Sequence, residues 1–144
     1  MLSDSEGIQS LIHTFAKEGK MLARSLQYIV EHIRDFYIAL DNETIVGCCA
    51  FMVSQKDLAE IKSLAVHPNY HRKGLAGALI RSGISDLVSL GVERVFCLTY
   101  VPDFFNKLGF TPIEKEQLPH KIWTECINCP SFPDCGEIAL IKTV

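Results

Sequence analysis

Apolar residues near the start of the chain recur at the spacing of one helix face and predict two amphipathic helices. The first begins near Asp4 or Ser5, either of which can cap it, and ends at Gly19. The second spans residues 26–33. The apolar positions that define these helices are Ile8, Leu11, Ile12 and Phe15 in the first and Leu26, Ile29, Val30 and Ile33 in the second.

Runs rich in β-branched and aromatic residues, separated by turn signals, predict the strands of a sheet. Phe36 to Leu40 and Ile45 to Val53 are joined by Asp41-Asn42-Glu43, which is a hairpin signal. A third strand runs from Ala59 to Val66 and is ended by His67-Pro68-Asn69. Beyond it we expect a helix over Gly74 to Leu90 ended by Gly91, a strand over Val95 to Thr99, a short helix over Pro102 to Leu108, a strand opening at Phe110 and a last strand over Glu137 to Lys142. This order predicts an α/β fold with a mixed sheet.

The composition favours one folded domain that spans residues 1–144. Hydrophobic residues make up 48% and charged residues 22%, as in ordinary globular proteins. The net charge of −3 gives no reason to expect nucleic acid or an anionic membrane as a partner. The longest apolar run, Ile45 to Val53, is too short to span a bilayer, and the start lacks the profile of a secretory signal. We therefore expect a cytoplasmic protein.

The most informative stretch, His71 to Ala76, joins the third strand to the helix that follows it. Free N–H groups and the dipole at the start of a helix form an anion site that suits a pyrophosphate. Gly74 allows the backbone to approach a ligand closely. Arg72 and Lys73 add positive charge at this point. A plain strand-to-helix turn without a ligand is the alternative interpretation.

Two segments resemble motifs of the GCN5-related N-acetyltransferases, the GNAT family. The loop from His71 to Ala76 is similar to the family's pyrophosphate loop, Arg/Gln-x-x-Gly-x-Gly/Ala, with a histidine in the first position. Phe104 to Phe110 looks like the family's aromatic-Tyr-x-x-x-Gly-Phe segment. The resemblance implies acetyl-CoA as co-substrate and a mixed, mostly antiparallel sheet flanked by helices. Because Met1-Leu2 leaves almost no room for the strand that usually precedes the first helix, we expect that strand to be missing or truncated.

A narrower resemblance concerns the acceptor. Gly19 to Ser25, Ala59 to Val66 and Leu98 to Tyr100 look like the acetyltransferase part of N-acetylglutamate synthases. This implies acetylation of a small amino acid, foremost glutamate, as in arginine biosynthesis. A guanidinium can hold a carboxylate in a bidentate fork, which is the role implied for Arg24. The implied substrate-binding residues are Arg24, Ser25, Lys62, Ser63 and Lys121, and the implied acetyl-CoA-binding residues are Leu64, Ala65, Val66, His71, Arg72, Lys73, Gly74, Leu75 and Ala76.

The same resemblance implies direct transfer with Glu60 as the general base. A base is useful because an α-amino group has a pKa of roughly 8 and is mostly protonated at neutral pH. Many family members use a tyrosine as the acid for the leaving thiolate, but this position is Phe105 here, as it is in the synthases. Thr99, Tyr100 or a water then serves, or the thiolate leaves unassisted. For Glu60, an exposed residue at the end of a strand is the alternative interpretation.

The six cysteines fall into two groups. Cys48, Cys49 and Cys97 lie inside apolar segments, where a thiol behaves as a small hydrophobe. Cys126, Cys129 and Cys135 follow His120 near the C-terminus and form an incomplete zinc-site pattern. We expect reduced, structural thiols and no bound metal, with zinc on the second group as the alternative.

Three functions stay open. The first is an N-acetyltransferase that acts on an amino acid. The second also uses acetyl-CoA but acetylates another small amine or a protein amine. The third is a non-catalytic metal or redox sensor that uses the cysteine-rich tail. The expected partners are a small-molecule amino acid and acetyl-CoA, without nucleic acid or membrane, and a homodimer stays open.

Overall fold

Six strands form one sheet in the computed structural model, which describes residues 1–118 and 137–144. The strand order is β1-β2-β3-β4-β6-β5, and within these residues the pairing of β3 with β4 is parallel while the other pairings are antiparallel. The strands are β1 (Phe36–Asp41), β2 (Thr44–Gln55), β3 (Leu58–Val66), β4 (Arg94–Thr99), β5 (Thr111–Pro112) and β6 (Ile138–Thr143). The helices are α1 (Ser5–Ala16), α2 (Leu26–Glu31), α3 (Leu75–Leu90) and α4 (Pro102–Asn106), with 3-10 turns η1 (Leu2–Asp4), η2 (Ile33–Asp35), η3 (Pro68–Tyr70) and η4 (Lys115–Gln117). The expected mixed, mostly antiparallel sheet is confirmed.

The predicted elements are present, and the differences lie at their ends. The first helix ends at Ala16, before Gly19, and the second predicted helix is divided into α2 and η2. Asp4 occupies the N-cap position of α1 but does not cap it, because its carboxylate accepts a hydrogen bond from the terminal amine of Met1 at 2.9 Å. The strand expected to open at Phe110 is the two-residue β5. Within the described ranges no strand precedes α1, as expected.

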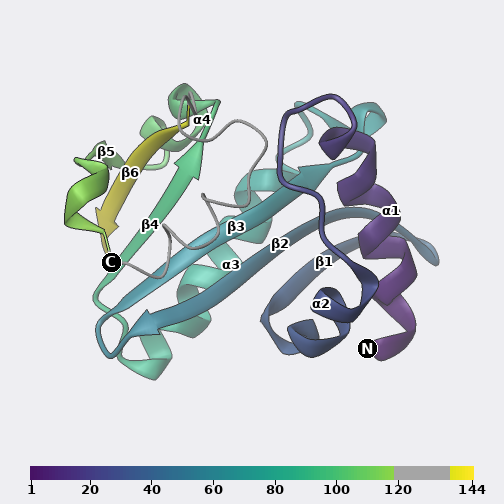
Figure 1. Cartoon of the computed structure of the whole chain (residues 1–144), viewed down its shortest axis with the longest axis horizontal. Coiled ribbons are helices and arrows are strands. Elements are labelled where there is room, and N and C mark those ends of the chain that lie inside the picture. The colour runs from purple at the N-terminus through teal and green to yellow at the C-terminus, as the bar shows by residue number, and fades with distance from the viewer. Residues whose placement is uncertain (119–136) are drawn as a thin grey trace.

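Helices cover both faces of the sheet (Figure 1). α3 packs on one face against β1, β2 and β3, and α1 with α2 packs on the opposite face. The core on the α3 side includes Phe51, Ile61, Leu79, Ile80 and Leu87, and the core under α1 and α2 includes Ile8, Ile12, Ile29 and Cys48. Among the residues described, no helix combines the length and the apolar character needed to cross a membrane.

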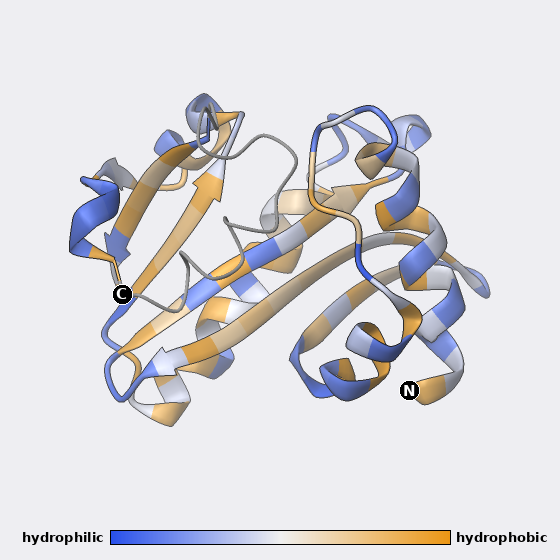
Figure 2. Ribbon diagram, in the orientation of Figure 1, coloured by the Kyte–Doolittle hydropathy of each residue, from blue (hydrophilic) through white to orange (hydrophobic). Residues whose placement is uncertain are grey.

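β3 differs from its neighbours because it carries polar side chains near its centre. Figure 2 shows hydrophobic colour along most of β2 and β4, whereas β3 has hydrophilic segments. Ile61 belongs to the core on the α3 side. Since side chains alternate along a strand, Glu60 and Lys62 lie on the other face of the sheet, which is the face of α1 and α2. The fold thus places two charged side chains where α3 does not cover them.

Candidate active site

The pairing of β3 with both neighbouring strands changes midway along its length. The register between β2 and β3 shifts so that β3 carries one extra residue, a β-bulge, in which Ser63 has a φ of 56°. The pairs on either side of the bulge are Cys48–Ala65 and Ala50–Lys62. On the other side of β3, the parallel pairing with β4 stops at Ile61 and Cys97. The second half of β3 is therefore not paired to β4, and its backbone groups on that side face a gap between the two strands.

A cavity of about 380 Å³ lies at this gap. Its walls come from the segment before α2, the centre of β3, the end of β4, α4 and the residue before β6. Of the residues that we predicted for the site, the cavity brings together Arg24, Glu60, Lys62, Ser63, Leu64, Thr99 and Tyr100. The remaining lining residues are Lys20, Met21, Leu22, Ile61, Cys97, Leu98, Val101, Phe105 and Glu137. The cavity therefore joins three cationic side chains to two carboxylates.

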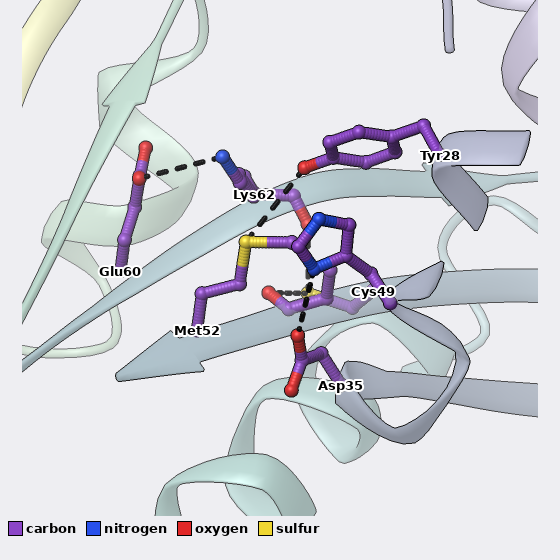
Figure 3. Close-up of polar contacts among 8 residues, drawn as sticks. Tyr28, Asp35, Cys49, Met52, Glu60 and Lys62 are labelled. Atoms are coloured by element: carbon purple, nitrogen blue, oxygen red, sulfur yellow. Dashed lines mark hydrogen bonds and ion pairs between the residues drawn. The ribbon is translucent and has the colours of Figure 1, made fainter. Parts of the chain in front are cut away.

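Glu60 and Lys62 form an ion pair on the wall of this cavity. Lys62 Nζ lies 3.7 Å from Glu60 Oε1, and only 11% of the Lys62 side chain and 13% of the Glu60 side chain are exposed. Figure 3 shows the Glu60 carboxylate directed toward the Lys62 ammonium. Because both side chains are largely buried, salt screens their electrostatic attraction much less than it would in a surface pair. A group that can accept a proton and a group that can bind a carboxylate thus lie side by side.

Arg24 reaches the cavity from the segment between α1 and α2. Its carbonyl oxygen accepts a hydrogen bond from Gln9 Nε2 at 3.3 Å, which ties the segment to α1. Its guanidinium carbon lies 4.5 Å from the centre of the Tyr28 ring. Ser25, predicted to bind substrate, is exposed and does not line the cavity. Its hydroxyl caps α2 instead by accepting a hydrogen bond from the Tyr28 amide at 3.0 Å.

The end of β4 supplies the residues predicted as alternatives for the general acid. Thr99 is 6% exposed, and its hydroxyl accepts a hydrogen bond from the Val101 amide at 2.9 Å. Tyr100 also lines the cavity and is 40% exposed. Phe105 is buried against Phe110, with ring centres 5.4 Å apart, and it presents a ring without a proton to the cavity.

The loop predicted to hold a pyrophosphate joins the end of β3 to α3. Gly74 is the N-cap residue of α3 and has a φ of 79°, a conformation that favours glycine. Arg72 also has a positive φ, of 63°. His71 Nε2 donates a hydrogen bond to the Val66 carbonyl at 2.6 Å, so the first residue of the motif closes the loop back onto β3. The sixteen-residue helix α3 thus begins with free N–H groups beside two basic side chains.

The loop is also fastened to the hairpin between β1 and β2. The Tyr70 hydroxyl donates a hydrogen bond to the Asp41 carboxylate, and this bond raises the pKa of Tyr70. The Lys73 ammonium lies 5.2 Å from the centre of the Tyr70 ring. These contacts limit the positions that the loop can adopt.

Among the cavity residues that were not predicted as parts of the site, three carry an ionisable side chain, namely Lys20, Cys97 and Glu137. Glu137 reaches the cavity because Ile138, next to it, pairs with Thr99 across β4 and β6. Burial and, next, the charges of Glu60 and Glu137 together raise the pKa of the Cys97 thiol to about 12. This thiol is therefore protonated at neutral pH and unsuited to carry an acetyl group as a nucleophile. No local signal distinguishes Glu137 from any other polar residue at the start of a strand.

Four predicted residues, Lys121, Cys126, Cys129 and Cys135, lie outside the described residues. Within residues 1–118 and 137–144, no group of three or more His, Cys, Asp or Glu side chains could hold a metal ion.

The chain matches known acetyltransferases over most of its length. Residues 7–110 match the model of the acetyltransferase (GNAT) family. An uncharacterised N-acetyltransferase of Chlorobaculum tepidum is 43% identical over 143 residues, which cover 99% of this chain and 92% of that protein. An amino-acid acetyltransferase of Mycobacterium tuberculosis is 32% identical over 134 residues, covering 90% of this chain and 75% of that protein.

Two solved structures have closely similar folds. A Mycobacterium tuberculosis protein in complex with CoA superposes with a TM-score of 0.84 at 28% identity and covers 100% of this chain and 96% of its own. The N-acetylglutamate synthase of Neisseria gonorrhoeae, complexed with coenzyme A and N-acetyl-glutamate, gives a TM-score of 0.87 at 25% identity. That match covers 97% of this chain but only 32% of the synthase. The sequence, the fold and the site agree: the chain belongs to the GNAT family and is an acetyl-CoA-dependent N-acetyltransferase related to the amino-acid acetyltransferases.

Proposed function

We propose that this enzyme acetylates the α-amino group of a small amino acid, with glutamate as the preferred acceptor, and so serves arginine biosynthesis. The observation that carries the proposal is the charge pattern of the cavity. Arg24, Lys62 and Lys20 offer binding groups for the carboxylates of an amino acid, and Glu60 offers a proton acceptor for its amine. The similarity to amino-acid acetyltransferases supports the same acceptor class.

In this proposal acetyl-CoA lies along the gap between β3 and β4. The pyrophosphate binds the loop from His71 to Ala76, where the N–H groups at the start of α3 and the side chains of Arg72 and Lys73 attract negative charge. The thioester lies beside the bulge, and backbone N–H groups near Leu64 and Val66 polarise its carbonyl oxygen. The end of the β3–β4 pairing at Ile61 supports this placement because it leaves the following β3 backbone groups unused by β4.

The transfer then removes two protons from the acceptor's ammonium nitrogen and releases one thiolate. Glu60 takes a proton from the acceptor's ammonium, and the free amine attacks the thioester carbonyl. The nitrogen of the tetrahedral intermediate loses its second proton to water. Collapse of the intermediate then forms the amide and breaks the carbon–sulfur bond, and CoA leaves as thiolate. Phe105 has no proton to give to this thiolate. Protonation therefore falls to Thr99, Tyr100 or a water.

An assay of free CoA with acetyl-CoA and each of the twenty amino acids tests the acceptor. We expect glutamate to be used best, with glutamine or aspartate as weaker acceptors. Arg24→Ala should raise the KM for glutamate by about tenfold or more, since a hydrogen bond to a charged group is worth about 1.5–3 kcal/mol. The KM for acetyl-CoA should stay unchanged.

Arg34→Ala is the matched control, because Arg34 is exposed and does not line the cavity. It should leave both KM values unchanged. An Arg24→Ala enzyme with weakened acetyl-CoA binding and an unaltered KM for glutamate would contradict the proposal. Acetylation of a polyamine or a peptide amine in preference to any amino acid would favour the second candidate function, in which another small amine or a protein amine is the acceptor. The carboxylates of Glu60 and Glu137 in the cavity could bind such a cationic acceptor.

A further inference from the structure

Three side chains at helical spacing form a stack beside the cavity. Arg24 precedes the N-cap residue of α2, Tyr28 belongs to the helix, and His32 is its C-cap residue. The guanidinium carbon of Arg24 lies 4.5 Å from the centre of the Tyr28 ring, and the His32 ring centre lies 4.4 Å from it. His32 is itself held by Asp35, with 3.3 Å between Nδ1 and Oδ2. The Tyr28 ring is therefore flanked by a cation and an anchored imidazole.

The Tyr28 ring is also held at both of its ends. At the backbone, its amide donates to the capping hydroxyl of Ser25. At the far end, its hydroxyl donates to Met52 Sδ on β2, at 3.7 Å. Met52 pairs with Glu60 across β2 and β3, and Figure 3 shows the Tyr28 hydroxyl directed toward the Met52 sulfur. The ring thus bridges from α2 to β2, the strand that neighbours β3 and its charged pair.

A guanidinium on a long flexible side chain needs such a support if it is to meet a carboxylate in one orientation. An aromatic face attracts a cation and restricts the positions that the guanidinium can take. We propose that Tyr28 is a positioning residue, which holds the Arg24 guanidinium at the cavity wall and thereby sets the affinity for the acceptor's carboxylate. This inference rests on the proposed function, in which Arg24 binds that carboxylate.

Two substitutions separate the ring from the hydroxyl. Tyr28→Leu removes the aromatic face and should raise the KM for glutamate by about two- to fivefold. This ratio corresponds to the free energy of an exposed cation–π contact. Tyr28→Phe keeps the aromatic face and loses only the hydrogen bond to Met52, so it should keep most of the wild-type affinity for glutamate. Neither should change kcat or the KM for acetyl-CoA. Tyr28→Met, which keeps an apolar side chain of similar length, repeats the test if Tyr28→Leu does not fold.

A double-mutant cycle with Arg24→Ala gives the decisive readout. If Tyr28 acts through Arg24, then Tyr28→Leu adds no further rise in KM once Arg24 is removed. Additive effects would mean that Tyr28 acts independently and would overturn the inference. A rise in KM with Arg24→Ala but none with Tyr28→Leu would also refute the inference and leave the proposed function intact. If Arg24→Ala itself left the KM for glutamate unaltered, the proposed function would fail first.

Discussion

At the scale of single residues, the surroundings of the Glu60 carboxylate differ from those of Glu137 in the same cavity. Glu60 belongs to β3, two residues before Lys62 at the edge of the bulge, and its carboxylate forms an ion pair with Lys62. Glu137 lies just before β6, on the far side of β4. Both line the cavity, but of the two only Glu60 belongs to β3, whose pairing with β4 stops one residue later at Ile61. The two carboxylates therefore provide a comparison between a base and a nearby charge.

Glu60→Gln keeps the shape of the side chain but removes the base. We expect kcat to fall by about 10²–10⁴-fold, the usual contribution of positioned general-base catalysis. The KM for acetyl-CoA should hardly change, and activity should partly recover at high pH, where the free amine of the acceptor accumulates. Steady-state kinetics across pH measures all three.

Glu137→Gln is the comparison variant and should reduce kcat much less than Glu60→Gln. The base assignment would be untenable if Glu60→Gln kept more than about a third of the wild-type kcat at neutral pH. Equal losses in the two variants would also contradict it, because they would indicate a general effect of charge.

At the scale of elements, the contact of α3 with β2 depends on a residue without a side chain. Gly83 is buried in the middle of α3, directly over Phe51 of β2. A Cβ at Gly83 would lie 2.2 Å from two carbon atoms of the Phe51 ring. The helix therefore approaches the sheet closely only because this position is glycine. Gly77 in the same helix meets only the flexible end of the Arg81 side chain, at 3.0 Å.

These two glycines predict opposite effects on stability. Gly83→Ala should lower the free energy of unfolding by about 1–3 kcal/mol or more, because the Phe51 ring or the helix must move. Gly77→Ala should raise it by up to about 1 kcal/mol through helix propensity, since Arg81 can turn aside. Urea unfolding followed by circular dichroism measures both changes. A Gly83→Ala protein as stable as wild type would show that the packing distance between α3 and β2 is not fixed by this glycine.

At the scale of the whole molecule, several ionisable groups are kept neutral by the packing of the sheet. Burial raises the pKa of the Cys48 thiol to about 12, as it does for Cys97. Tyr37 has a pKa raised to about 12 by burial and, next, by the hydrogen bond that its hydroxyl donates to the Asp86 carboxylate. Cys48 and Cys49 also contact the carbonyl groups of Ser63 and Lys62 at the bulge. The protonated thiols of Cys48 and Cys49 thus pack against the bulge.

The raised pKa values predict a loss of stability in alkaline solution. In the unfolded chain the thiols release their protons near pH 9 and Tyr37 near pH 10, whereas in the folded chain they hold them to about pH 12. The unfolded state then binds fewer protons, so the free energy of unfolding falls as pH rises through this window. Urea unfolding at about pH 8 and about pH 10.5 should show lower stability at the higher pH. Tyr37→Phe should flatten the part of the decline above pH 10, and equal stability at the two pH values would refute the prediction.

Local signals were enough to predict most of the elements and one half of the site. Turn residues and apolar spacing mark the hairpin after β1 and the boundaries of α3, because each depends on neighbours within one or two turns of chain. The anion loop is equally local, since Gly74 and the basic residues before it adjoin the start of the helix that they serve. Arg24, Glu60 and Lys62 were predicted through resemblance to a family and not through spacing.

Only the tertiary structure decided which distant residues meet. Glu137 lines the cavity because β6 pairs with β4 across some forty positions of sequence, and the stack of Arg24 on Tyr28 depends on how α2 is capped and docked. The gap between β3 and β4 arises because their pairing stops at Ile61, and nothing in either strand's sequence marks that point. Sequence determines the local geometry of a segment through its backbone preferences. Strand pairing and helix docking are decided by burial summed over the whole sheet, so the contacts that complete the cavity become visible only in the folded chain.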